Sequence, residues 1–248
     1  MKIDKRKNYY LIFDTETTGG DVNIKLIYDI GYVIADKKQV YIKRNYLVKE
    51  IFENEELMNT AYYVNKLPKY KAMVKNGEVD IKPFAEIMKI LQKDLHNYNV
   101  KFACAYNINF DLDAFMQTTE HIYVNRFKML FRPTKSEKWA PDYVNFVKKY
   151  IFKDLQIEIL DIWTMACQTL CNQKTFQAFY KKTTARGNII SNAEIVYNYV
   201  NDLNGEFVES HTALSDSEVE TEILQRILKL RKPEFTITFF PFRLIKAC

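Results

Sequence analysis

Two carboxylate side chains stand in this sequence at a spacing that would let them act on one ion. Asp14 and Glu16 close the apolar run of LIFDTETTGG, residues 11–20. In a strand, the side chains at i and i+2 project from the same face, about 7 Å apart at the backbone. Carboxylates so close repel each other unless a proton or cation intervenes, and their oxygens favour Mg²⁺ or Mn²⁺. A solvated pair of acids at a strand end is the alternative, so the pair needs partners elsewhere.

A third acid follows another apolar segment. Asp111 lies in YNINFDLDAF, residues 106–115, at the expected start of a helix. The helix dipole favours acids in a first turn, so a purely local role for Asp111 remains open, as does a turn role for Asn107. Asp111 is a candidate ligand only if the fold brings it to the first pair.

A histidine and a fourth acid occur in HTALSDSEVE, residues 211–220. Asp216, Val219 and Ile223 are spaced i, i+3, i+7, which places Asp216 on the helix face that packs on the core. A carboxylate there is costly unless it is paired or bound to a metal. His211 comes five residues earlier, at the helix start, and its ordinary pKa of about 6.5 suits a general base near neutral pH.

The elements that must position these residues follow from the apolar pattern. The first three strands have short connections, which favours an antiparallel meander, and the later strands alternate with helices, which favours a mixed α/β sheet. The five predicted strands cover residues 8–16, 26–35, 39–48, 100–106 and 157–162.

Helices are predicted between and after these strands, while residues 50–80 suggest an irregular or short-helical excursion and 122–154 a Lys-rich insertion. Ser191 and Glu194 match a capping box that opens one of the helices. The predicted helices cover 82–96, 107–122, 163–173, 191–202 and 212–231.

The composition is that of a folded chain of 248 residues, 48% hydrophobic, with a net charge of +5. The charge suits a polyanionic partner without requiring one. Four cysteines lack the spacing of a zinc site, which predicts reduced thiols in the core. No apolar run is long enough to span a membrane, and the N-terminus is charged, so we expect a soluble, cytoplasmic protein. The Lys-rich, Asn-rich bias would suit a phage or AT-rich bacterium.

Taken together, the three segments resemble the motifs of DEDDh-type (DnaQ-like) 3′–5′ exonucleases. The matching stretches are Asp14-Thr15-Glu16-Thr17-Thr18-Gly19, Asn107-x-x-Phe110-Asp111 and His211-x-Ala213-x-x-Asp216. The Tyr-containing form of the family has tyrosine where this chain has Thr212. EILDIW also resembles a family strand, which makes Asp161 a candidate for supporting the site without binding metal.

The resemblance implies an α/β, RNase H-like fold and hydrolysis of phosphodiester bonds with two Mg²⁺ or Mn²⁺ ions about 3.5–4 Å apart. It further implies that Asp14 bridges both ions, that Glu16 and Asp216 hold the water-activating ion, and that Asp111 supports the other. His211 would take the proton from the attacking water. The implied arrangement is a single exonuclease domain, 1–231, with insertions near 50–80 and 122–154 and a tail, 232–248.

The resemblance also implies a substrate: a single-stranded nucleic acid 3′ end, with DNA favoured over RNA. The backbone of Thr17 would meet the terminal hydroxyl, Asn107 would hydrogen-bond near the metals, and Gly19 would let the chain turn away. Phe110 or Phe115 could stack on a base, although core packing is the stronger explanation for both. A role in DNA replication or repair would need a separate polymerase as partner; the oligomeric state is open.

Three alternatives remain at this stage. An RNA- or oligonucleotide-trimming exoribonuclease shares the same residues. A catalytically inactive module of this fold could bind nucleic acid or scaffold a polymerase, although all five site residues are present. An aspartyl-phosphate phosphatase has Asp-x-Asp-x-Thr after its first strand, but its second acid is Asp where this chain has Glu16, and it leaves His211 and Asp216 unexplained.

Overall fold

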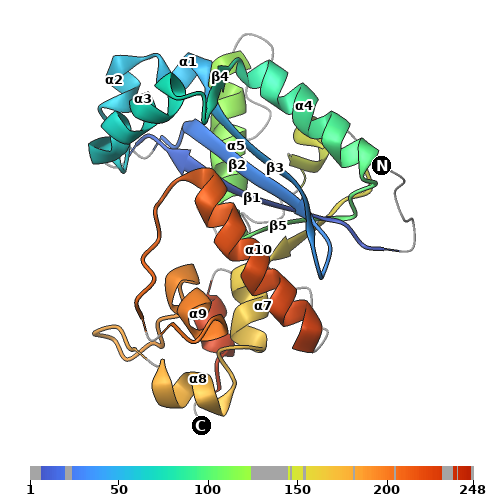
Figure 1. Cartoon of the computed structure of the whole chain (residues 1–248), viewed down its shortest axis with the longest axis vertical. Helices are drawn as coiled ribbons and strands as arrows, with labels where there is room; N and C mark the ends of the chain where they lie inside the picture. Colours follow the sequence, from blue (N-terminus) through green and yellow to red (C-terminus); the bar gives the residue numbers. More distant parts are fainter. Residues whose placement is uncertain are drawn as a thin grey trace.

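The computed structural model describes residues 7–19, 24–123, 145, 147–152, 155–180, 182–203, 205–230, 237–238 and 240–246. One sheet lies at the centre, and helices cover both of its faces (Figure 1). The sheet has six strands in the order β4-β3-β2-β1-β5-β6.

The strands combine an antiparallel meander with parallel pairs. Strands β1, β2 and β3 form the meander, β5 pairs parallel with β1, and β6 pairs parallel with β5. Their bounds are β1 Tyr10–Thr17, β2 Ile27–Ala35, β3 Val40–Val48, β4 Asp80–Lys82, β5 Phe102–Ala105 and β6 Glu158–Asp161. The predicted mixed α/β class is confirmed.

The predicted number of strands is wrong, because β4 adds a sixth to the five. Its three residues, Asp-Ile-Lys, are too short to show any alternation in the sequence. The strand exists because its backbone pairs parallel with the outer edge of β3. The rest of the 50–80 segment forms short helices, as predicted.

Most predicted helices are present within a few residues of their expected bounds. The helices are α1 Lys49–Phe52, α2 Glu55–Met58, α3 Leu67–Lys75, α4 Phe84–Asn97, α5 Ile108–Tyr123, α7 Ile162–Gln168, α8 Lys174–Phe179, α9 Ala193–Val200 and α10 Ala213–Leu230, with single turns η1 Val64–Lys66, η2 Val147–Ile151 and η3 Pro241–Leu244. Most of the predicted 122–154 insertion lies outside the described residues.

The predicted capping box is wrong. Asn192, not Ser191, caps α9, because its side chain accepts a hydrogen bond from the Ile195 amide. The Glu194 carboxylate accepts a hydrogen bond from the Glu209 amide instead of reaching back to the cap. Ser191 accepts one from the Trp163 ring nitrogen, so tertiary contacts have replaced the local pattern.

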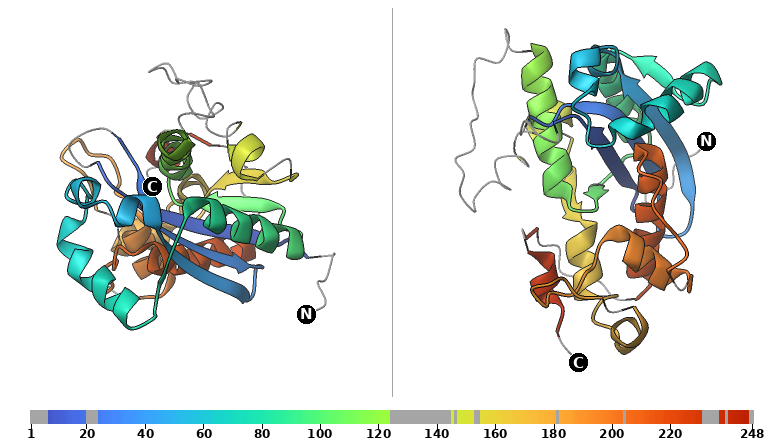
Figure 2. Two further views of the ribbon diagram at one scale, coloured as in Figure 1. Left: turned by 90° about the horizontal axis from the view of Figure 1, so that it is seen from above. Right: turned by 90° about the vertical axis from the view of Figure 1, so that its left-hand side faces the viewer.

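Two hydrophobic cores lie on opposite faces of the sheet, and β1 contributes to both. Its residues Leu11 and Phe13 pack in one core with α4 and α5, whereas Tyr10 and Ile12 pack in the other with α7, α9 and α10. Figure 2 shows the sheet between these helical layers. Because the side chains of a strand alternate, β1 fixes both layers relative to the residues at its C-terminal end.

Three cysteines, Cys104, Cys167 and Cys171, are buried and free, as predicted for core thiols. Among the described residues, no helix combines the length and hydrophobicity that crossing a membrane would require.

Candidate active site

The site lies where β1 extends beyond the end of its parallel neighbour, β5. Strand β5 pairs only with Tyr10–Ile12, so the C-terminal half of β1 has a free edge on that side. A cavity of about 530 Å³ opens there. Its walls come from β1 and the following turn, the loop before α3, the start of α5 and the N-terminal parts of α9 and α10: Asp14, Thr15, Glu16, Thr17, Thr18, Gly19, Lys25, Tyr62, Tyr63, Tyr106, Asn107, Phe110, Asn192, Ala193, Glu209, His211, Asp216 and Glu220.

Helix α10 reaches β1 because a glycine lets it approach the sheet. Gly31 on β2 pairs with Asp14 on β1. A Cβ at Gly31 would lie 2.1 Å from the backbone of Ala213 and Leu214. No side chain fits there, so the first turn of α10 lies directly on the sheet, and Asp216 is carried to the side of Asp14 and Glu16.

A buried acid anchors the start of α10. The Asp29 carboxylate accepts hydrogen bonds from the Ala213 amide at 3.0 Å and from the Tyr70 hydroxyl at 2.8 Å. Burial raises the pKa of Asp29 to about 6, although these hydrogen bonds oppose the shift. Asp29 therefore positions α10 from behind the cavity, a role that its place in the sequence does not reveal.

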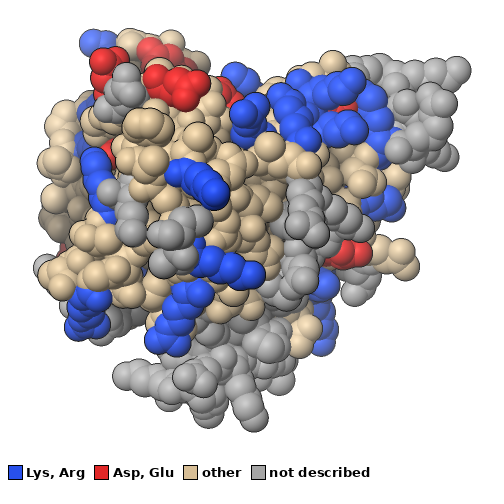
Figure 3. Space-filling model, turned by 90° about the horizontal axis from the view of Figure 1, so that it is seen from below, with Lys and Arg blue, Asp and Glu red and all other residues tan. Residues whose placement is uncertain are grey.

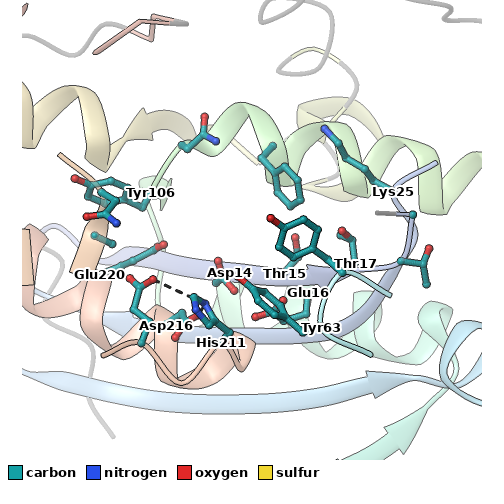
Figure 4. Close-up of a pocket in the computed structure, with 18 residues that line it drawn as sticks. Asp14, Thr15, Glu16, Thr17, Lys25, Tyr63, Tyr106, His211, Asp216 and Glu220 are labelled. Carbon is teal, nitrogen blue, oxygen red and sulfur yellow. Dashed lines mark ion pairs between the residues drawn. The ribbon is translucent and has the colours of Figure 1, made fainter. Parts of the chain in front are cut away.

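Three of the predicted residues converge tightly. Ligand atoms of Glu16, His211 and Asp216 all lie within 4.8 Å of one another. Figure 4 shows His211 between the acids, with its Nδ1 3.8 Å from Asp216 Oδ2. Among the described residues, Asp216 Oδ1 is buried without a hydrogen-bond partner. The carboxylate oxygens fit a divalent cation of the Mg²⁺ or Mn²⁺ class, and the His211 ring lies beside them.

The carboxylates at this site repel one another. Burial, followed by the charge of Asp216, raises the pKa of Glu16 to about 9, and Glu16 is only 6% exposed. Burial and the charge of Glu209 raise the pKa of Asp216 to about 7. The pKa of Asp14 is raised by burial and then by the charge of Asp111. A bound cation would relieve this repulsion.

Asp111 lies behind the cavity rather than on its wall. Its carboxylate is buried and accepts a 2.7 Å hydrogen bond from the Thr15 hydroxyl. Burial raises its pKa to about 7. Because Thr15 lies between Asp14 and Glu16 on β1, this hydrogen bond brings Asp111 to the other predicted acids around the end of β1.

The ring of His211 is held by an aromatic partner. It stacks on Tyr63 with the centroids 4.4 Å apart and an angle of 13° between the planes. Its backbone is left-handed, with φ +48°. Burial and the nearby Lys66 cation lower the pKa of His211, which favours the neutral imidazole at neutral pH.

The predicted substrate-contacting residues Thr17, Asn107 and Phe110 line the cavity. Phe115 does not, because it is buried in the core against Phe13. Gly19 has φ +92°, and a Cβ there would lie 1.9 Å from the Ile24 carbonyl oxygen, so the turn after β1 requires glycine as predicted.

Asp161 supports the second motif from outside the cavity. Its carboxylate accepts hydrogen bonds from the amides of Asn107 and Ile108, and it caps α7 through the Thr164 amide. It therefore fixes the turn at Asn107, whose φ is +62°. The supporting role expected of this residue agrees with these contacts.

Several lining residues were missed by the sequence reasoning. Tyr62, Tyr63 and Lys25 come from connecting segments, where no pattern marks them. Glu209 is equally unmarked. Glu220 had a readable signal, because it follows Asp216 by four residues and so shares its helix face.

Comparison with solved structures shows which known fold this architecture resembles. Exonuclease I of E. coli in complex with a dA16 oligonucleotide matches with a TM-score of 0.52 and 12% identity, over 92% of this chain. Exonuclease I of Methylocaldum szegediense matches with a TM-score of 0.53 and 14% identity, also over 92%. This chain has an RNase H-like fold.

A product-bound exonuclease I structure gives a TM-score of 0.54 with the RNase H-like fold of this chain, at 12% identity over 91% of it. This chain spans less than half of each of these proteins, 42–44% of their length. By sequence, no family model and no curated protein matches. The fold is therefore shared, while activity has to be argued from the site.

Proposed function

We propose that this protein is a metal-dependent 3′–5′ exonuclease that acts on single-stranded nucleic acid, with DNA favoured over RNA. The convergence of Asp14, Glu16, Asp216 and His211 on one open cavity, with Asp111 directly behind, carries the proposal. The residues come from β1, α5 and the start of α10, far apart in sequence. Mutually repelling acids on a cavity wall are costly for folding, which favours a function that uses them.

Two Mg²⁺ or Mn²⁺ ions, when bound, supply an activated water and stabilise the leaving oxygen. Asp14 would hold both, Glu16 and Asp216 one of them, and Asp111 the other. The unpartnered Oδ1 of Asp216 supports this assignment, because a buried carboxylate oxygen without a donor is otherwise unfavourable. Without a cation, the negative charge of the same acids would repel the phosphate of a substrate.

His211 would accept the proton of the attacking water. Its lowered pKa leaves the imidazole unprotonated at neutral pH, as a general base requires. Tyr63 holds the ring plane, and the Asp216 carboxylate lies 3.8 Å from Nδ1, where it would stabilise the imidazolium that forms.

The turn after β1 would receive the 3′ terminus. Thr17 and Asn107 line the wall beside the acids, and Phe110 offers a ring to the terminal base. Lys25 lies over that ring, with its Nζ 4.5 Å from the centroid and paired with Asp113 Oδ2 at 3.0 Å. The similarity to exonuclease I, seen with a dA16 oligonucleotide, supports DNA as the substrate.

An aromatic hollow next to the cavity supports a single strand. It measures about 380 Å³, shares Tyr106, Asn107 and Asn192 with the main cavity, and adds Trp163 and Phe242. Aromatic faces of this kind accept unpaired bases regardless of sequence. On the face seen from below, the charged side chains of the described residues are mostly Lys and Arg, which suits a polyanion (Figure 3).

We further propose that residues 1–231 act as one exonuclease domain, since the acids come from both sides of the 122–154 segment. The phosphatase alternative is less well supported, because it gives no role to His211 or Asp216 beside Glu16. An inactive module would retain the fold without needing the full set of acids.

Labelled oligonucleotides test the proposal. Single-stranded DNA, single-stranded RNA and duplexes carrying a 5′ label are incubated with the protein and Mg²⁺ or Mn²⁺. We expect a ladder shortened from the 3′ end, fastest on single-stranded DNA and abolished by EDTA or by Asp14→Ala. Asp80→Ala makes the same change at an exposed position and should retain activity. Internal cleavage, or activity that survives Asp14→Ala, would contradict the proposal.

A further inference from the structure

Glu220 is a buried carboxylate that the proposed mechanism leaves without a role. It lies one helical turn after Asp216 on α10, is 3% exposed, and lines the same cavity. In Figure 4 it points from α10 toward β1 and Asp14. Among the described residues, its Oε2 has no hydrogen-bond partner.

The surroundings of Glu220 do not compensate its charge. The Tyr106 amide donates a hydrogen bond to the carboxylate, but the charges of Asp111, Asp216 and Glu209, all acidic, join burial in raising the pKa of Glu220. Among the ion pairs of the described residues, none involves Glu220. An ionised carboxylate buried among acids is strongly unfavourable unless a cation joins it.

The position of Glu220 indicates which part of the site it serves. Glu220 lies on the wall of the same cavity as Asp14 and points toward it (Figure 4). It is absent from the tight group of Glu16, His211 and Asp216. Glu220 therefore lies on the Asp14 side of the cavity, apart from that group.

We propose that Glu220 is an additional carboxylate ligand, which holds a cation in this cavity together with Asp14. This inference rests on the proposed function for the presence of the ions, and adds a residue that none of the three sequence motifs contains. Its consequence is that one of the two ions binds more tightly than it would without Glu220, because each added carboxylate ligand strengthens the attraction.

Titration with Mn²⁺ tests the inference without measuring activity. Isothermal titration calorimetry and melting curves at neutral pH would compare the wild-type protein with Glu220→Gln. Glu222→Gln, an exposed position on the same helix, is the matched control. We expect two ions in the wild type and in the control, and in Glu220→Gln one of the two to bind at least about tenfold more weakly.

The melting curves separate a ligand from a structural anchor. As a ligand, Glu220 destabilises the metal-free protein, so Glu220→Gln should melt higher than the wild type in EDTA and gain less from Mn²⁺. Unchanged Mn²⁺ affinity together with a lower melting temperature in EDTA would overturn the inference and leave only the Tyr106 hydrogen bond. If Glu220→Gln does not fold, Glu220→Asp carries the same test, with weaker binding of one ion expected and unchanged binding contradicting it.

The outcome is independent of whether the exonuclease proposal holds. Loss of one ion in Glu220→Gln, with no nucleotide released by the wild type, would support the ligand and refute the activity. Nucleotide release by the wild type, with both ions retained in Glu220→Gln, would support the activity and refute the ligand. A wild type that binds no Mn²⁺ would refute the ligand directly.

Discussion

His211 is held in place by its surroundings rather than by its own segment. Tyr63 stacks on one face of the ring, and the Lys66 ammonium lies 4.7 Å from the centroid of Tyr63 and donates a hydrogen bond to the Ser210 carbonyl. Lys66 thereby ties the loop before α3 to the segment that carries the histidine. A flexible imidazole would lose much of its value as a base, because proton transfer requires a fixed geometry.

Tyr63 is therefore expected to act through His211. Tyr63→Leu should lower the rate of nucleotide release by about tenfold or more, because the ring of His211 loses its stacking partner. Tyr63→Phe keeps the ring and should keep most of the rate. Single-turnover assays on single-stranded DNA, together with Mn²⁺ titration, check this expectation. A loss of Mn²⁺ binding that parallels the rate would contradict it.

At the scale of elements, the contact between α10 and β2 places the last acid. Ser217 reinforces this contact, since its hydroxyl donates a hydrogen bond to the Gly31 carbonyl at 3.0 Å. Asp111 on α5 is positioned differently. Its carboxylate accepts a hydrogen bond from Thr15 of β1, and Asp161 holds the turn before α5. Two separate elements thus bring their acids to the free edge of β1.

Gly31→Ala should displace α10. The added Cβ would meet backbone atoms at 2.1 Å, which cannot rotate away, so we expect a loss of about 3 kcal/mol in the free energy of unfolding. Weaker Mn²⁺ binding should accompany it, because Asp216 moves with the helix. Urea denaturation and Mn²⁺ titration measure both effects.

Gly77→Ala is the matched control for Gly31→Ala. No atom lies within 4 Å of a Cβ at Gly77, so only its positive φ, +72°, opposes the substitution, at about 1 kcal/mol. Mn²⁺ binding should not change there. Equal effects of the two substitutions would show that the close approach at Gly31 is unimportant.

For the whole molecule, the site reduces stability when no cation is bound. Burial raises the pKa values of Glu16 to about 9 and of Asp111, Asp216 and Glu209 to about 7, from ordinary values of 4.5 for Glu and 3.8 for Asp. The folded state therefore binds more protons than the unfolded state. The stability from these protons is complete below about pH 4 and is lost as the pH rises toward about 9.

In EDTA, the melting temperature should therefore fall between about pH 5 and about pH 8. His211 opposes this trend only weakly, because its pKa is lowered and it is one group against several acids. Mg²⁺ should raise the melting temperature more at the higher pH, because it replaces the protons. Differential scanning calorimetry with NaCl of equal ionic strength as control measures this. A stability in EDTA that rises across this range would contradict the predicted repulsion.

The sequence by itself indicated the four acids, His211 and the class of the fold. Asp14 and Glu16 share a face because a strand repeats every two residues, and Asp216 shares a face with Val219 and Ile223 because a helix repeats every 3.6. Such local periods can be read directly from the sequence, so the meander, the main helices and the acids were all predictable. The role of each acid in catalysis stays a prediction.

Only the tertiary structure decided what surrounds those residues. Strand β4 exists through pairing with β3, Asn192 replaced Ser191 as a cap, and Tyr63 reached His211 from a loop about 150 residues away in the chain. Glu220 carries no local sign that its oxygen is left without a partner. These features depend on contacts between distant segments, and such contacts leave no period in the sequence.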